Sequence, residues 1–257
     1  MQINEKNKLY HVNLAKCDLQ GATLALLPGD PQRVDCLAKL LDDNAQFLGS
    51  HREYTSALVK INSKNILICS TGMGGPSTGI CIEELAMLGI NQFIRIGTTG
   101  AIQPQIKLGD IILTTASVRL DGTSVHYAPI EYPAVADFDL TMKLAKSARE
   151  QGIVIHLGIT ASSDTFYPGQ ERYDNYSGYI RRHFQGSMNE WQKLNVLNYE
   201  MESASLLTIC STFGLKAASI AAVLANRAVS EKPDVSNYDQ SMQQMVKIIA
   251  QAIATDI

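Results

Sequence analysis

The chain has 257 residues, of which 46% are hydrophobic and 18% are charged, and its formal net charge is −3. This balance is typical of a globular protein with a large core, and the weak negative charge excludes a general attraction to nucleic acid or anionic membranes. Any anionic ligand must therefore be held by a few cationic side chains placed at one site.

The N-terminus is polar, and no apolar run approaches the length of a membrane span, so we expect a cytoplasmic protein without membrane contact. The five cysteines include no Cys-x-x-Cys pair, which predicts neither a disulfide framework nor a zinc site.

Short apolar runs alternate with longer runs of helical spacing along the chain. We expect strands at residues 21–27, 55–61, 65–70, 111–115, 154–160, 196–199 and 215–225. Helices are expected at residues 31–41, 75–88, 136–151, 187–194, 203–212 and 238–254. Because no repeat, linker or low-complexity tract interrupts this alternation, we predict one α/β domain with a layered, mainly parallel sheet.

The sequence around Arg95 gives the first candidate site. The apolar residues 91–94 precede this arginine, and a stretch of glycine and threonine at residues 97–100 follows it. The pattern predicts a buried strand that ends in a tight turn, and ligands of α/β proteins collect beyond such strand ends. Arginine and threonine would donate hydrogen bonds to an oxyanion there. A buried arginine beside an ordinary turn explains the same pattern about equally well.

A second anion-binding element is indicated where the first predicted strand meets the first predicted helix. Gly29 would let the backbone approach a ligand, Asp30 suits an N-cap, and Pro31 suits the first helical position. Arg33 falls in the first turn of the helix, where the helix dipole also favours an anion. Taken alone, a well-capped helix with a surface arginine is the better explanation of this segment.

Two loops complete the candidate pocket. Residues 71–78 hold three glycines before a helix, but their spacing matches neither a Walker A loop nor a dinucleotide fingerprint. Residues 162–173 are polar and aromatic, and Phe166, Gln170 and Arg172 would suit a flat ligand with heteroatoms at its edge. An exposed loop with incidental aromatic residues is the alternative.

Two carboxylates flank Met201 at a predicted strand–helix junction. Glu200 and Glu202 would suit the recognition of hydroxyl groups, because an ionised carboxylate accepts several hydrogen bonds. Glutamate near a helix N-terminus is also favourable for the helix dipole alone. Slightly upstream, Ser187 and Glu190 predict a capping box for a short helix.

Taken together, these segments resemble the nucleoside phosphorylase-I family, and most closely its bacterial uridine-cleaving members. The matching stretches cover nearly the whole chain, at residues 19–25, 28–31, 50–53, 70–77, 95–100, 160–174, 199–203 and 226–227. The resemblance implies a three-layer α/β/α domain over residues 1–257, with a central twisted, mainly parallel mixed sheet, assembled as a homohexamer (a trimer of dimers). It also implies reversible phosphorolysis of uridine to uracil and α-D-ribose 1-phosphate in pyrimidine salvage and catabolism.

The resemblance assigns roles to individual residues of this chain. Phosphate would be held by Gly29, Arg33, Arg95, Thr98 and, from a neighbouring subunit, Arg52. Ribose would be held by Thr98, Met201, Glu202 and the neighbouring subunit's His11. The base would be held by Phe166, Gln170, Arg172 and Arg227. Catalysis would rest on Arg95, Gln170, Arg172 and Glu202, with inorganic phosphate as co-substrate and without an organic cofactor. A structural monovalent cation, K⁺, would be bound at the dimer interface by Glu53, Met73 and Ser77.

The residue after the last predicted strand bears on the choice of base. Purine-cleaving members of this superfamily have an aspartate there that protonates the purine, whereas this chain has Asn226, which favours a pyrimidine. The nearest rival is a purine nucleoside phosphorylase or a nucleosidase, and the nucleosidases lack the full set of phosphate arginines. A catalytically silent nucleoside-binding protein is a rival from another class, but no expected site residue is missing.

The chain departs from the family pattern at three places. Tyr10 stands where the family has phenylalanine, and Leu224 and Ala225 are smaller than the usual aliphatic pair. Residues 230–237, which we call the flap segment, are dissimilar. These departures leave open the selectivity between uridine, deoxyuridine and thymidine.

Overall fold

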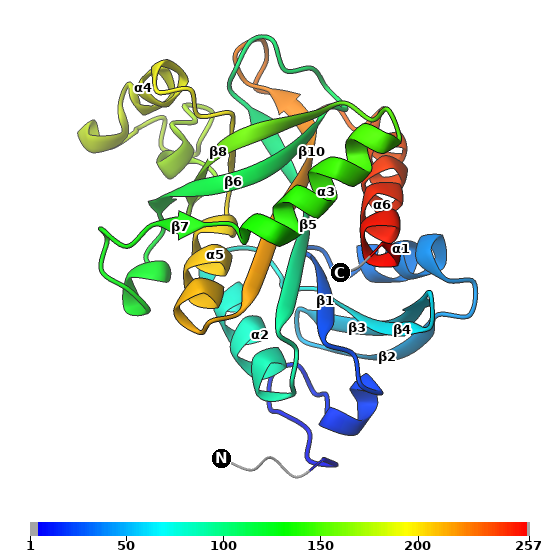
Figure 1. The fold of residues 1–257 in the computed structure, drawn as a ribbon. Helices are drawn as coiled ribbons and strands as arrows, with labels where there is room; N and C mark the ends of the chain where they lie inside the picture. Colours follow the sequence, from blue (N-terminus) through cyan, green and yellow to red (C-terminus); the bar gives the residue numbers. More distant parts are fainter. Residues whose placement is uncertain (1–4, 256–257) are drawn as a thin grey trace.

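The computed structural model describes residues 5–255, so the two ends of the predicted 1–257 domain lie outside the described residues. A mixed β-sheet runs through the molecule, and helices cover both of its faces (Figure 1). The strands are β1 (Leu24–Pro28), β2 (Gln46–His51), β3 (Tyr54–Ile61), β4 (Lys64–Cys69), β5 (Gln92–Ala101), β6 (Ile111–Leu120), β7 (Ala134–Val135), β8 (Ile155–Ser163), β9 (Asn198–Glu200) and β10 (Lys216–Asn226). The α-helices are α1 (Arg33–Leu41), α2 (Gly75–Met87), α3 (Phe138–Glu150), α4 (Ser187–Lys193), α5 (Ser203–Thr212) and α6 (Tyr238–Ala254).

The sheet has the strand order β10-β6-β8-β9-β5-β1-β4-β3-β2, and β10 also pairs with β5. Parallel pairings join β4, β1, β5 and β10, and a second parallel set joins β6, β8 and β9. Because β10 pairs with both β5 and β6, five strands (β5, β9, β8, β6 and β10) close into a ring. The α/β fold with a mixed sheet is confirmed, whereas the closure of one end was not predicted.

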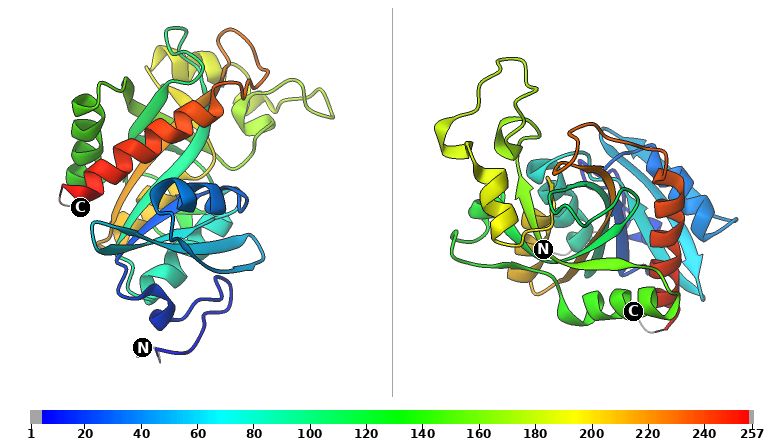
Figure 2. Two further views of the ribbon diagram at one scale, coloured as in Figure 1. Left: turned by 90° about the vertical axis from the view of Figure 1, so that its right-hand side faces the viewer. Right: turned by 90° about the horizontal axis from the view of Figure 1, so that it is seen from above.

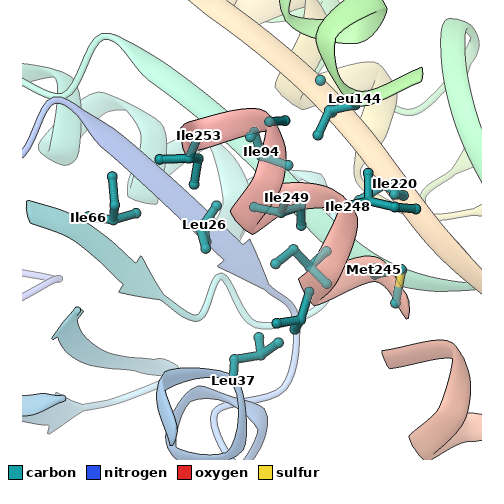
Figure 3. Close-up of a cluster of buried hydrophobic side chains, with 14 of the residues drawn as sticks. Leu26, Leu37, Ile66, Ile94, Leu144, Ile220, Met245, Ile248, Ile249 and Ile253 are labelled. Carbon is teal, nitrogen blue, oxygen red and sulfur yellow. The ribbon is translucent and has the colours of Figure 1, made fainter. Parts of the chain in front are cut away.

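Each face of the sheet has its own core. In β1, Leu24 and Leu26 face the core under α1, α3 and α6, while Ala25 and Leu27 face the core under α2 and α5. This alternation follows from the two-residue repeat of a strand, and burial on both faces explains why β1 is continuously apolar. Figure 2 shows α3 beside α6 on the first face, and Figure 3 shows Leu26, Ile94 and Ile249 within that core.

The turn predicted after Arg95 is wrong, because β5 continues straight through residues 97–100 to Ala101. Those residues pair with β10 on one side, from Gly97 opposite Ala221 onward, and Gly100 pairs with Tyr199 of β9 on the other. The glycines therefore belong to a paired strand rather than to a turn. For the same reason β6 continues to Leu120, well past its predicted end.

The N-terminal capping of two helices also differs from the prediction. Helix α1 begins two residues later than expected, and the Asp30 carboxylate accepts a hydrogen bond from the backbone N–H of Gln32 at 2.9 Å without capping the helix. The capping box predicted for α4 does not form; instead the Glu171 carboxylate accepts from the backbone N–H of Met188 at 2.8 Å. Within the described part of the chain, no helix is both long enough and apolar enough to cross a membrane.

Candidate active site

A cavity of about 620 Å³ lies over the carboxyl-terminal half of β5. Strands β1 and β4 end beside it, and the loop after β8, the β9–α5 junction and the flap segment form its other walls. The predicted site residues that line it are Gly29, Arg33, Glu53, Met73, Arg95, Thr98, Phe166, Gln170, Arg172, Met201 and Glu202. Those that do not line it are His11, Arg52, Ser77 and Arg227. The fold thus gathers most of the predicted set in one place.

Arg95 lies at the floor of the cavity, and two carboxylates hold its guanidinium. Its Nε lies 3.4 Å from Glu200 Oε2, and its Nη2 donates to Glu202 Oε2. Its Nη1 is buried and has no hydrogen-bond partner among the described residues. A side chain at Gly29 would place a Cβ 3.8 Å from this Nη1, so the absence of one leaves room beside it. Because buried guanidinium groups seldom lack partners, this nitrogen indicates a site for an anion.

The two glutamates at the β9–α5 junction have different tasks. Glu200 accepts from the backbone N–H groups of Glu202 and Ser203 at 2.9 Å, so it stabilises the start of α5. This agrees with the alternative that a glutamate there serves the helix N-terminus. Glu202 accepts from the backbone N–H of Gly74 at 2.6 Å, and both glutamates line the cavity. Burial raises the pKa of Glu202, Arg95 opposes the shift, and Glu200 adds to it. Because the Glu200 carboxylate is occupied by donors at the start of α5, Glu202 is the better placed of the two to accept from a ligand.

Another part of the cavity, near Gly100 of β5, forms a slot lined by Phe166, Gln170 and Arg172. Gln170 is only 3% exposed, and its amide makes no hydrogen bond within the described residues. The Arg172 guanidinium carbon lies 4.1 Å from the centroid of the Phe166 ring, so cation and ring are stacked. The pKa of Arg172 is lowered, first by burial and then by the neighbouring Arg227. A buried amide and a stacked guanidinium would suit the polar edge of a flat heterocycle.

Arg227 lies behind this slot, outside the cavity lining, and a residue that sequence reasoning missed holds it there. Glu231 of the flap segment accepts from Arg227 Nε at 2.7 Å and from Arg172 Nη1 at 2.6 Å. The only signal in the sequence is a carboxylate four residues after Arg227, in a stretch we interpreted as a polar loop.

Arg52 and His11 lie on the outside of their own chain. Arg52 has a left-handed backbone conformation (φ 56°), and its Nη2 donates to the Tyr10 hydroxyl at 3.2 Å. The Nδ1 atom of His11 lies 2.7 Å from a carboxylate oxygen of Glu84. That Arg52 and His11 contribute to the phosphate and ribose subsites of a neighbouring subunit stays a prediction.

The three residues predicted to bind a monovalent cation gather around Gly72. Ser77 Oγ donates to the Met73 carbonyl at 3.0 Å. A Cβ at Gly72, whose φ is 71°, would lie 3.0 Å from Glu53 Cβ and 3.3 Å from Ser77 Oγ. The described residues contain no cluster of three or more His, Cys, Asp or Glu side chains suited to a metal ion. A single carboxylate with carbonyl and hydroxyl oxygens would suit a monovalent cation better than a transition metal, and its binding stays a prediction.

The family model of the phosphorylase superfamily matches residues 23–256. The chain belongs to this superfamily. It is 56% identical over 247 residues to the uridine phosphorylase of Escherichia coli, covering 96% of this chain and 97% of that protein. It is 54% identical over 244 residues to the uridine phosphorylase of Haemophilus influenzae, covering 95% and 96%. It is 33% identical over 230 residues to the guanosine phosphorylase of Halorubrum lacusprofundi, covering 90% and 89%.

Membership of the phosphorylase superfamily confirms the resemblance predicted from the motifs. The side chain of Asn226 does not line the cavity. Its amide donates to the backbone carbonyls of Gln103 at 3.1 Å and Ile106 at 2.5 Å, both within the protein interior. At this position the chain therefore presents neither an acid nor a free amide to a bound base.

Proposed function

We propose that this protein is a uridine phosphorylase, which cleaves uridine reversibly with inorganic phosphate to uracil and α-D-ribose 1-phosphate. One observation carries the proposal: a single cavity is lined both by Arg95, whose Nη1 lacks a partner among the described residues, and by Gln170, whose amide makes no hydrogen bond within them. The first would receive phosphate and the second the edge of a pyrimidine. The high identity to proteins named uridine phosphorylase supports the same activity.

The phosphate end of the site would act by holding the nucleophile. Arg95, Arg33 and Thr98 line the cavity beside Gly29, so they are placed to donate to the oxygens of a phosphate ion. Phosphate is already a nucleophile, so no side chain has to be activated for the attack. Holding two reactants in a reactive geometry can by itself lower a barrier by roughly 7–11 kcal/mol.

The ribose and base ends would stabilise the charges that develop in the reaction. As a phosphate oxygen bonds to C1′ and the glycosidic bond breaks, the sugar gains positive charge and the bond electrons move to the uracil ring. Glu202 would accept hydrogen bonds from the ribose hydroxyls and place negative charge near this cation. Gln170 and Arg172 would donate to the carbonyls of the departing base, which then takes up a proton.

The state of Asn226 favours a pyrimidine over a purine. The purine-cleaving proteins that this chain resembles protonate the leaving group with an acid at the end of the last core strand, whereas here the Asn226 amide is committed to two backbone carbonyls. No contact among the described residues argues in the same way against deoxyuridine or thymidine, so both are candidate substrates.

We further propose a homohexamer, a trimer of dimers, in which Arg52 and His11 complete the phosphate and ribose subsites of a neighbour. The support is that both lie outside the cavity of their own chain, while Tyr10, Phe47 and Met73 expose most of their apolar side chains. A structural K⁺ bound by Glu53, Met73 and Ser77, no organic cofactor and a cytoplasmic location complete the proposal.

The decisive experiment is to follow the ultraviolet change of uridine cleavage by the purified protein with and without phosphate, with inosine in parallel. Phosphate-dependent loss of uridine is expected. Cleavage of inosine but not uridine would refute the choice of base, and cleavage of uridine without phosphate would identify a hydrolase.

A further inference from the structure

The carboxylate of Glu231 joins the two arginines at the base end of the cavity. Its Oε2 lies 2.6 Å from Arg172 Nη1 and 2.7 Å from Arg227 Nε, and its Oε1 lies 3.0 Å from Arg227 Nη2. Arg172 and Arg227 are each only 4% exposed, whereas the Glu231 side chain is 39% exposed. A partly exposed carboxylate therefore bridges two buried cations.

The two guanidinium groups need this anion. Arg172 and Arg227 lie close enough for each charge to disfavour the other, and burial removes the water that would screen them. Arg172 Nε and Arg227 Nη1 are buried and lack partners among the described residues, so no further carboxylate in that part of the chain neutralises these atoms. Glu231 is the carboxylate that contacts both guanidinium groups, and Asp174 adds a weaker attraction that raises the pKa of Arg172.

The bridge also fixes where Arg172 points. On one side its guanidinium carbon lies 4.1 Å from the Phe166 ring centroid, and on the other its Nη1 is held by Glu231. The side chain of Arg227 fills the space behind, with its Cδ 3.2 Å from where a Cβ on Gly100 would lie. The stack and the bridge together leave Arg172 little freedom to swing away from the cavity.

Glu231 reaches the arginines from the flap segment, which joins the end of β10 to α6 (Figure 1). Two residues further on, Pro233 of the same segment lines the cavity. The segment thus contributes a wall of the cavity and the carboxylate that orients the base-facing arginine. Any displacement of the segment would remove both together.

We propose that Glu231 is a positioning residue for the pyrimidine. It aligns Arg172 with the edge of the base and fastens the flap segment over the base end of the cavity, so that flap position and base recognition are coupled. The kinetic part of this inference, the effect on the KM for uridine, rests on the proposed function. The Glu231 bridge differs in this from an incidental surface ion pair, which would contribute little to substrate binding or turnover.

The test uses the full-length protein and the variant Glu231→Gln, with Asp234→Asn as a matched control. Asp234 is an exposed carboxylate of the same segment, and its Oδ1 accepts from the backbone N–H of Ser236 at 2.8 Å. In Glu231→Gln the KM for uridine should rise by about tenfold or more, while the KM for phosphate should change by less than about twofold. The phosphate ligands lie at the other end of the cavity, so only the base end should respond.

A second measurement does not depend on turnover. Uracil added to the wild type with phosphate should slow amide hydrogen exchange in residues 230–237, and this protection should be lost in Glu231→Gln but kept in Asp234→Asn. An unchanged uridine KM in Glu231→Gln, or equal rises in both KM values with a lower melting temperature, would overturn the proposal. If the wild type itself fails to cleave uridine with phosphate, the proposed function fails, and the exchange rates of residues 230–237 in the ligand-free wild type and Glu231→Gln still decide whether Glu231 fastens the segment: faster exchange in the variant supports this role, and equal rates refute it.

Discussion

Replacement of Arg95 by methionine tests the core of the site, because it removes one cation from between two buried carboxylates. Glu200 and Glu202 are each at most 6% exposed, and both lose their shared guanidinium in this variant. Removal of one partner from a buried ion pair costs about 3–5 kcal/mol. At about 2–4 °C per kcal/mol for a chain of this size, the melting temperature should fall by roughly 6–20 °C. Phosphate-dependent turnover should also disappear.

Thermal unfolding with and without phosphate separates the two effects. Phosphate should raise the melting temperature of the wild type and leave that of Arg95→Met unchanged, because ligand binding to the folded state alone stabilises it. The double variant Arg95→Met/Glu202→Gln should recover part of the lost stability, since it removes one uncompensated charge, but no turnover. If Arg95→Met kept the phosphate-dependent stabilisation, the anion site would lie elsewhere. An unchanged melting temperature without phosphate would refute the argument from buried charges.

Three further predictions concern other parts of the site. Gln170→Ala should lower kcat/KM for uridine by about 10²-fold or more, since it removes a donor to the leaving base; an unchanged kcat/KM, measured by the ultraviolet assay, would remove Gln170 from the base site. Burial raises the pKa of Glu202 above its ordinary value of 4.5, so the folded state binds the extra proton. The wild type should therefore lose stability relative to Glu202→Gln as the pH rises from below 4.5 through the raised pKa, as measured by urea unfolding; a difference independent of pH would contradict this. Arg52→Ala and Arg95→Met should each be inactive alone but recover activity when co-expressed, because mixed oligomers contain intact shared sites; no recovery would place Arg52 outside a shared site.

The relation between sequence and structure differs from one part of the site to another. The hydrophobic alternation and the loop chemistry were enough to predict an α/β fold and to single out Arg95, Gln170, Arg172 and Glu202. All four line one cavity. The fold class could be predicted because buried strands and polar loops differ in local composition, which can be read without knowing what packs against them, whereas the roles of the four residues stay predictions.

Local reasoning failed where a distant strand decided the outcome. Residues 97–100 have the composition of a turn, but pairing with β9 and β10 makes them the end of a long strand. Helix α4 has the sequence of a capping box, but Glu171 of a preceding loop satisfies its first backbone N–H groups. In both cases a partner far along the chain offered hydrogen bonds that the local pattern could not reveal.

What the sequence by itself determined is therefore the family, the fold class and the chemical character of each pocket wall. Only the tertiary structure decided that one nitrogen of Arg95 lacks a partner among the described residues, that Glu200 stabilises the start of α5, and that Glu231 bridges Arg172 and Arg227. The physical reason is that hydrophobic pattern is a property of neighbouring residues, whereas the pairing of a buried charge depends on which side chains the fold brings within about 3 Å of it.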